Sequence, residues 1–189
     1  MNLNNLKSEI LHIFQKEGKI IKSFVDDPYF NLQNFEFLKA KNKNLITIGE
    51  GAYGKVFLAK HKKTDKKYAI KVINKDFLSR IERTEEPLVE RLVMSKWRHP
   101  SIVRLSLSFQ SKHKLFFVIE YCPNKDLDEL LHKLGIFDND LALQIIAELV
   151  NVIDYLHNDI EISHNDLKPS NILLDEHYHI KLIDFLHQK

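Results

Sequence analysis

The string HNDLKPSN at residues 164–171 holds the side chains of this chain that are best suited to chemistry. Asp166 and Asn171 lie five residues apart, with Lys168 between them. A carboxylate can accept a hydroxyl proton, an amide oxygen can bind Mg²⁺, and an ammonium group can offset the charge of a phosphate. Asp184, thirteen residues after Asn171, could supply a second oxygen ligand. The pattern predicts a magnesium and phosphate site around this loop.

A second candidate is the glycine-rich string GEGAYG at residues 49–54, which Lys55 and Val56 follow. Glycines at this spacing let backbone N–H groups approach phosphate oxygens, which a side chain would hold away. Three glycines also occur in ordinary hairpin turns, and this alternative stays open. A dinucleotide-binding fold would require a helix after the loop, whereas the loop here runs into another strand-like string.

A lysine and a glutamate could complete a phosphate site. Lys71 comes seventeen residues after Gly54, and on a strand its side chain would point away from those of Ile70 and Val72. It is either an ordinary exposed strand lysine or an ammonium group directed at phosphates under the glycine loop. Glu90, on the helix predicted next, could pair with it.

Short runs of β-branched and apolar residues predict the strands that position these groups. The strings are LITIG, KVFLAKH, KYAIKVI, IVRLSLSF, LFFVIEY, NILLD and HIKLID. Most of the strands come first and most of the helices later, so the layout predicts an α+β chain in two parts that join near residues 121–125.

Capping signals and periodicity predict three helices in the main part of the chain. The first runs from an N-cap at Thr84 to about Trp97. The second, a short helix, lies between a capping box that begins at Asp126 and a terminating Gly135. The third spans about residues 139–157 and is apolar nearly all round, which is typical of a helix inside a protein.

Composition narrows the class of protein. The chain has 189 residues, 44% of them hydrophobic, and a net charge of +2, which is not the pattern of a nucleic-acid binder. A single cysteine, Cys122, excludes an internal disulfide and fits a reducing compartment. We expect no membrane span and no secretion signal, and hence a soluble protein of the cytoplasm or the nucleus. Residues 1–34 carry apolar side chains at helical spacing up to near Gly18, for packing on their own domain or docking elsewhere.

Taken in order, the motifs resemble the signature set of the eukaryotic protein kinases. The matching strings are GEGAYGKV, AIK, HNDLKPSN and DF, and the match is continuous from about Ile48 to Phe185. The lysine in DLKPSN is similar to that of the serine/threonine-specific branch. The strings RHPSIVRL, FFVIEYCPNKDLDELL and NDLKPSNILLD resemble the AGC group, and EEPLVERLVMSKWRHP resembles phosphoinositide-dependent kinase.

The resemblance implies a bilobal fold. It predicts an N-terminal extension over residues 1–34, an N-lobe of antiparallel sheet and one helix over 35–120, a hinge at 121–125, and a partial, mainly helical C-lobe over 126–189. It also implies an internal hydrophobic stack made of Met94, Leu105, His164 and Phe185.

The resemblance further implies ATP and Mg²⁺ as cofactors and a protein as substrate. Asp166 would orient the substrate hydroxyl and take its proton, Lys168 would contact the γ-phosphate, and Asn171 and Asp184 would hold Mg²⁺. Lys71, held by Glu90, would bind the α- and β-phosphates. The implied ATP-binding residues are Ile48, Gly49, Glu50, Gly51, Ala52, Tyr53, Gly54, Val56, Ala69, Lys71, Glu120, Cys122, Asp126 and Leu173. Within that set, the glycines would cover the phosphates and the apolar residues would sandwich the adenine. The backbone of Glu120 and Cys122 would meet the edge of the adenine, and Asp126 would reach the ribose, a role compatible with that of N-cap.

The chain departs from the family pattern at three points. Asn165 replaces the arginine that usually pairs with an activation-loop phosphate, and Leu186 replaces the flexible glycine after Phe185. The sequence ends at Lys189, before the family's activation segment, so we expect the apolar helix over 139–157 to need a partner. An ATP-binding pseudokinase that acts as a scaffold, or an inactive fragment, are therefore alternatives to a protein serine/threonine kinase.

Two histidines near the end of the chain could also bind a metal. His177 and His179 would share one face of a strand, but no further ligand is evident, so a solvated hairpin is the preferred interpretation.

Overall fold

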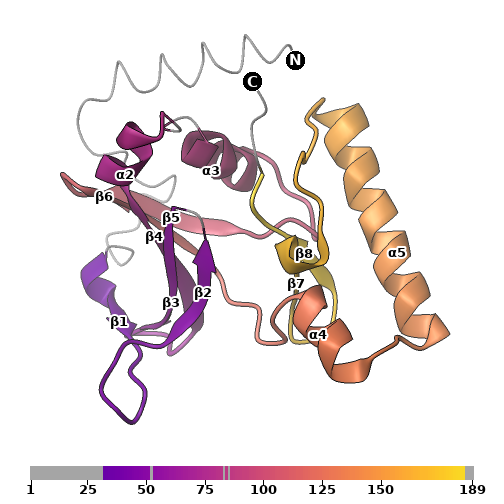
Figure 1. Cartoon of the computed structure of the whole chain (residues 1–189), viewed down its shortest axis with the longest axis horizontal. Helices are drawn as coiled ribbons and strands as arrows, with labels where there is room; N and C mark the ends of the chain where they lie inside the picture. The colour runs from indigo at the N-terminus through magenta and orange to yellow at the C-terminus, as the bar shows by residue number, and fades with distance from the viewer. Residues whose placement is uncertain (1–31, 52, 83, 85, 186–189) are drawn as a thin grey trace. The chain divides into compact units, whose positions relative to one another are not determined.

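The computed structural model describes residues 32–185 apart from positions 52, 83 and 85 (Figure 1). Backbone contacts divide this range into two units. The sheet unit contains residues 32–85 and 104–121, and the helical unit contains residues 86–103 and 122–185. The helix predicted before Gly18 lies outside the described residues, as does Leu186. The predicted lobe and hinge boundaries remain predictions.

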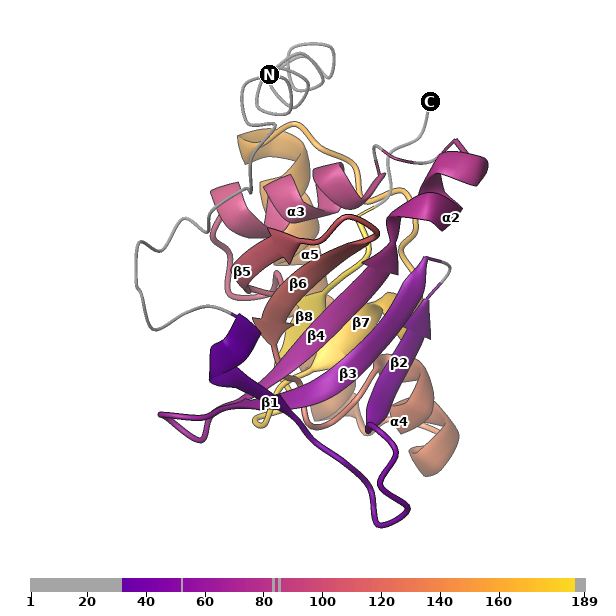
Figure 2. The same cartoon turned by 90° about the vertical axis from the view of Figure 1, so that its left-hand side faces the viewer.

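The sheet unit is built on six antiparallel strands in the order β1-β3-β4-β6-β5, with β2 paired to β3 (Figure 2). The strands are β1 (Phe35–Phe37), β2 (Thr47–Gly51), β3 (Gly54–His61), β4 (Lys67–Asn74), β5 (Leu105–Gln110) and β6 (Lys114–Glu120). A 3₁₀ turn, η1 (Leu32–Asn34), precedes β1, and a short helix, α2 (Lys75–Arg80), follows β4.

Strand alternation gives this sheet two different faces. Side chains at alternate positions of β4, Tyr68, Ile70 and Val72, pack into an apolar cluster with their neighbours on the adjoining strands. The buried members of that cluster are Phe35, Ala59, Tyr68, Ile70, Leu107 and Val118. Because successive side chains on a strand point to opposite faces, Ala69 and Lys71 belong to the other face.

The helical unit contains three α-helices among its described residues, with short turns and a β-hairpin (Figure 1). They are α3 (Glu86–Lys96), α4 (Leu127–Leu134) and α5 (Asn139–Asp154). A π-helical turn, η2 (Tyr155–Asp159), ends α5, and a 3₁₀ turn, η3 (Pro169–Asn171), leads into the hairpin of β7 (Ile172–Leu174) and β8 (Ile180–Leu182). The predicted α+β class is confirmed.

The core of the helical unit joins α3, α5 and the hairpin. Its most enclosed side chains have 0 to 1% of their surface exposed, and they are Val93, Val152, Leu156, Leu174, Ile180, Leu182 and Phe185. Each fully buried side chain of this kind stabilises the fold by about 2 kcal/mol relative to an exposed one. The hairpin therefore has an apolar anchor on the inner side of the unit.

The outer face of α5 is apolar and exposed. Leu143, Ile146 and Val150 recur at helical spacing, with 65%, 56% and 63% of their surface accessible. The apolar character predicted for this helix is present, but within the described residues only its inner side is buried, on Ile145 and Val152. No helix in residues 32–185 combines the length and apolar composition required to cross a membrane.

Local capping chemistry explains where the later helices begin and end. Asp126 caps α4, with its Oδ1 accepting from the backbone N–H of Glu129 at 2.8 Å, and Gly135 ends that helix with φ of 78°. Asp138 caps α5 in the same way. The sequence patterns did not predict β1, which is only three residues long, or α2, which Asn74 caps.

Candidate active site

The loop between η2 and β7 brings Asp166, Lys168 and Asn171 together. Lys168 Nζ donates to Asp166 Oδ2 at 2.8 Å. Asn171 Nδ2 donates both to the backbone oxygen of Asp166 and to its Oδ2, each at 2.8 Å. Asn171 is 4% exposed, whereas 30% of the Asp166 side chain is accessible. A buried amide therefore fixes the loop, and the carboxylate that it orients remains reachable from solvent.

Charge and hydrogen bonding keep Asp166 ionised. The hydrogen bond from the Lys168 ammonium is the largest effect and lowers the pKa of the Asp166 carboxyl; burial opposes it, and the hydrogen bond from the Asn171 amide adds a further, smaller lowering. The same contact raises the pKa of Lys168. At neutral pH the loop therefore presents an oriented carboxylate beside an ammonium group.

His164 joins this loop to the segment that carries Asp184. Its Nε2 donates to the backbone oxygen of Ile183 at 2.9 Å, and its Nδ1 accepts from the backbone N–H of Asp166 at 3.4 Å. These contacts fit the neutral ring protonated at Nε2. Burial lowers the pKa of His164, which also favours the neutral ring. The ring also lies 4.9 Å from that of Phe185, which is itself buried. Met94 is buried on α3, and Leu105 belongs to the sheet unit.

Two residues of the site have left-handed backbone conformations. Asn165 has φ of 63° and Asp184 has φ of 57°. This region costs most non-glycine residues about 1 to 2 kcal/mol, and asparagine and aspartate adopt it most readily. Strain of this kind persists where the surrounding contacts determine the backbone, and it is concentrated at functional sites.

The donor set of the helical unit fits a magnesium ion. Because Asn171 Nδ2 faces two acceptors, its Oδ1 points elsewhere, and that oxygen accepts no hydrogen bond from the described residues. A buried amide oxygen without a donor is the kind of hard ligand that Mg²⁺ binds. The hairpin joins this residue to the segment of Asp184, since the backbone N–H of Ile183 donates to the backbone oxygen of Asn171 at 3.1 Å.

The sheet unit places several predicted nucleotide contacts on one face. Lys71 lies directly opposite Val56 on β3 and Phe117 on β6, and Ala69 lies opposite Leu58. Directly opposed residues of antiparallel strands share a face, so Val56, Ala69 and Lys71 lie on the face opposite the apolar cluster. Lys71 is half-buried, and it is therefore not an ordinary exposed strand lysine.

The three glycines of the loop have different structural roles. A Cβ added at Gly54 would lie 1.9 Å from the backbone oxygen of Val72, so the fold itself requires glycine there. At Gly49 the nearest atoms would be 3.6 Å away, and at Gly51 nothing lies within 4 Å. Neither has a positive φ. The fold does not require glycine at these two positions, which leaves the close approach of a ligand as a reason for it.

The remaining predicted contacts are distributed over both units. Asp126 and Leu173 are joined by a backbone bridge in the helical unit, where Cys122 is also buried. Glu120 ends β6, with its Oε1 accepting from the backbone N–H of Arg104 at 2.7 Å. Ile48 is 40% exposed, Glu50 pairs with Lys55 at 3.1 Å, and the backbone oxygen of Tyr53 accepts from Asn74 at 3.2 Å. Ala52 lies outside the described residues.

Glu90 is 6% exposed on α3 in the helical unit, whereas Lys71 lies in the sheet unit. Their pairing, and the convergence of Lys71 with Asp166, Asn171 and Asp184 on one nucleotide, remain predictions.

The two histidines near the hairpin differ in their surroundings. In residues 32–185 no group of three or more histidine, cysteine or acidic side chains has the arrangement to hold a metal ion. His177 is exposed in the hairpin turn, whereas His179 contacts a glutamate on α5, Glu148. The sequence patterns did not identify that contact, because it depends on how the hairpin packs against the helix.

An antiparallel sheet with a glycine loop, followed by a helical unit with an Asp–Lys–Asn loop, defines the protein-kinase-like class of folds. The sequence matches the protein kinase domain family over residues 43–188. The chain belongs to this family.

Individual relatives agree with that assignment. Protein kinase 3 of Dictyostelium discoideum is 40% identical over 154 residues, which cover 82% of this chain and 16% of that protein. Serine/threonine-protein kinase PKH2 of Saccharomyces cerevisiae is 43% identical over 139 residues, or 73% of this chain and 13% of its own. The 3-phosphoinositide-dependent protein kinase B of D. discoideum is 39% identical over 152 residues, or 80% and 16%. The chain thus spans less than a fifth of the length of these relatives.

Proposed function

We propose that this chain acts as an ATP-dependent protein serine/threonine kinase domain, which transfers the γ-phosphate of ATP to a serine or threonine hydroxyl of a protein. The observation that carries the proposal is the Asp166–Lys168–Asn171 network, in which a buried amide orients a solvent-reachable carboxylate beside an ammonium group. The family membership and the names of the relatives support the same reaction class.

In this mechanism the chain's residues position charges and do little covalent chemistry. Asp166, which is ionised at neutral pH, accepts a hydrogen bond from the substrate hydroxyl and takes its proton as the phosphate transfers. Lys168 offsets negative charge on the transferring group. Lys71 binds the α- and β-phosphates, and Gly49 and Gly51 leave space for the backbone to approach them.

Magnesium would be held by Asn171 Oδ1 and the carboxylate of Asp184. When bound, the ion neutralises charge on the phosphates and orients them for transfer. Asn171 would be a rigid ligand, because its side chain is buried and its Nδ2 donates two hydrogen bonds to Asp166. Val56, Ala69, Leu173 and Ile48 would enclose the adenine, Glu120 and Cys122 would present backbone groups to it, and Asp126 would reach the ribose.

We further infer that the chain is an AGC-like kinase similar to the phosphoinositide-dependent kinases, which the name of one relative supports. Two features bear on activity. Asn165 occupies the position at which the family usually has an arginine, which points to control without an activation-loop phosphate. The exposed stripe of Leu143, Ile146 and Val150 on α5 supports a protein partner that covers it. We expect the protein in the cytoplasm or nucleus, which imaging of a tagged chain would test.

Two assays test the proposal. A thermal-shift titration with MgATP measures binding, and a folded sample without a shift at saturating nucleotide would refute it. A γ-phosphate transfer assay on a mixed peptide library, with Lys71→Met and Asp166→Asn as controls, measures catalysis. Equal signals from the unaltered chain and both variants, together with normal binding, would replace the kinase by an ATP-binding pseudokinase that acts as a scaffold.

A further inference from the structure

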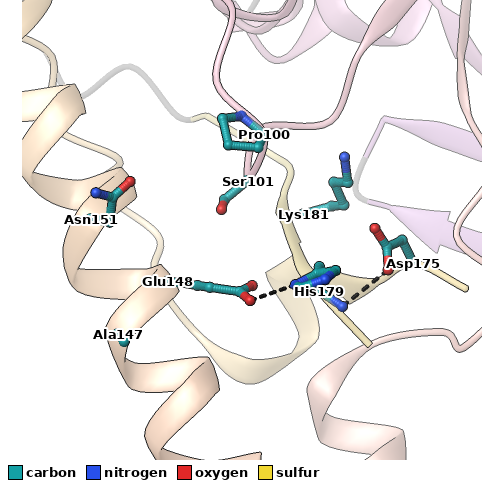
Figure 3. Close-up of a pocket in the computed structure, with 8 residues that line it drawn as sticks. All are labelled: Pro100, Ser101, Ala147, Glu148, Asn151, Asp175, His179 and Lys181. Atoms are coloured by element: carbon teal, nitrogen blue, oxygen red, sulfur yellow. Dashed lines mark hydrogen bonds and ion pairs between the residues drawn. The ribbon is translucent and has the colours of Figure 1, made fainter. Parts of the chain in front are cut away.

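Glu148 lies in the middle of α5 and contacts His179 of the β7–β8 hairpin (Figure 3). Its Oε2 accepts from the backbone N–H of Ile180 at 2.9 Å. Its Oε1 accepts from His179 Nδ1 at 2.6 Å and from Gln144 Nε2 at 3.1 Å. Only 21% of the Glu148 side chain is exposed, so these donors replace water in stabilising its negative charge.

A second carboxylate orders the hairpin turn that presents His179. Asp175 Oδ1 accepts from the backbone N–H groups of His177 at 2.9 Å and His179 at 3.0 Å. Figure 3 shows His179 between Glu148 and Asp175, with dashed contacts to both. We call Glu148, His179 and Asp175 the hairpin clasp.

Backbone hydrogen bonds hold the other end of β8, the strand that the clasp contacts. The N–H of Leu182 donates to the oxygen of Ser101 at 2.8 Å, and the oxygen of Leu182 accepts from Val103 at 3.0 Å. On α5, Asn151 Oδ1 accepts from His99 Nε2 at 2.8 Å, which ties the helix to the same segment. Each strand of the hairpin has only three residues, and an isolated hairpin is at best marginally stable, so these external anchors determine where it lies.

The hairpin carries a candidate magnesium ligand at each end. Asn171 comes immediately before β7, and Asp184 follows β8 by two residues. Ile180, held by Glu148, lies four residues before Asp184, a span of about 13 Å of extended chain. The site and the clasp are therefore opposite ends of one short structural element.

We propose that Glu148 is a positioning residue for Asn171 and Asp184, because it fixes the hairpin to α5 and so sets where their oxygens lie. The inference rests on the proposed function, since it takes these two residues as the ligands of the magnesium that accompanies ATP. The described partners of the Glu148 carboxylate do not include Asn171 or Asp184, so Glu148 acts on them through the backbone of β8.

Protonation of His179 strengthens the clasp. The hydrogen bond and charge of Glu148 raise the pKa of His179, and the charge of Asp175 adds to that effect, whereas burial and Lys181 oppose it. These are the charged groups that face the ring from α5, from the turn and from β8. Because the pKa in the folded state is raised, the contribution is present below the usual pKa of about 6.5 and is lost as pH rises through the higher, folded value.

Amide hydrogen exchange on the full chain tests the clasp itself. Glu148→Ala should increase exchange at Ile180 and Ile183 at least tenfold, whereas Glu176→Ala, which removes an exposed carboxylate from the same hairpin, should change neither. Should Glu148→Ala fail to fold, Glu148→Gln retains an acceptor for Ile180; it should keep that amide protected and abolish the pH dependence of its protection factor, the ratio of the intrinsic to the observed exchange rate. Unchanged exchange in Glu148→Ala, or a protection factor that keeps its pH dependence in Glu148→Gln, would overturn the clasp.

Magnesium dependence tests the positioning role. Binding of a non-hydrolysable ATP analogue is titrated with Mg²⁺ and, separately, measured in excess chelator. In Glu148→Ala the Mg²⁺ concentration that gives half-saturation should rise about tenfold, which is the lower end of the effect seen when a residue that supports a metal ligand is removed. The affinity for the ATP analogue in excess chelator should stay unchanged. If nucleotide affinity falls equally with and without Mg²⁺, the positioning role is refuted and Glu148 has only a structural role. If the unaltered chain binds no nucleotide in response to Mg²⁺, the proposed function and the positioning role both fail, while the exchange result still decides whether the clasp exists.

Discussion

Replacing Asn171 by alanine should destabilise the helical unit by about 3 kcal/mol. The amide of Asn171 donates two hydrogen bonds of 2.8 Å, one to a backbone oxygen and one to the carboxylate of Asp166. Hydrogen bonds to neutral groups contribute about 1 kcal/mol and those to charged groups about 2 kcal/mol. Because Asn171 is 4% exposed, water cannot readily replace the lost donor, and the backbone oxygen of Asp166 loses a partner.

Urea denaturation followed by circular dichroism measures this loss as a change in the free energy of unfolding. Asn158→Ala is a matched control, since Asn158 Nδ2 also donates to a carboxylate, Asp154 Oδ1, at 2.6 Å, but on an exposed surface. Exposed substitutions usually change stability by less than about 0.5 kcal/mol.

A loss below about 1 kcal/mol, or one equal to that of Asn158→Ala, would refute the claim that a buried amide holds this loop in place. A large loss with an unchanged pKa of Asp166 would contradict the electrostatic part of the reasoning, since the Asn171 hydrogen bond helps to lower that pKa. Carbon-detected NMR titration of the Asp166 carboxyl group distinguishes these results.

Three further predictions follow from single sites. Gly54→Ala should lower the free energy of unfolding in urea titration by at least about 3 kcal/mol, because the added Cβ would lie 1.9 Å from the backbone oxygen of Val72. Gly51→Ala should leave the free energy of unfolding unchanged in the same titration, and it should weaken ATP binding measured by calorimetry. Burial lowers the pKa of His164, so the unfolded state takes up a proton first; stability should fall as pH drops below about 6.5, and His164→Gln should flatten this decline in pH-dependent melting. Val150→Glu, on the exposed stripe of α5, should reduce self-association measured by analytical ultracentrifugation, and unchanged association would indicate that the stripe is not a contact surface.

Most elements of the fold could be predicted because their signals are local. Strand alternation in KYAIKVI, the capping Asp126 and the terminating Gly135 each depend on residues within one turn or strand. The two elements that were not predicted have weak local signals: β1 spans three residues and is held by pairing to β3, and α2 has six residues.

The candidate site was predictable as a set of residue types but not as a set of contacts. Asp166, Lys168 and Asn171 are close in sequence, so their chemistry could be inferred from spacing. Their hydrogen bonds, and the contact of His164 with Asp166, depend on a backbone that turns through a left-handed residue at Asn165. Spacing alone does not specify such a turn.

The sequence by itself determined the kinase family, the α+β class and a set of candidate residues for the chemistry, because motif spacing and strand or helix periodicity are properties of the linear chain. Only the tertiary structure decided which glycine the fold requires, which buried amide oxygen accepts no hydrogen bond from residues 32–185, and that Glu148 holds the hairpin between Asn171 and Asp184. These outcomes depend on distances between atoms remote in sequence, such as Glu148 and Ile180, thirty-two residues apart, and such distances are set by packing.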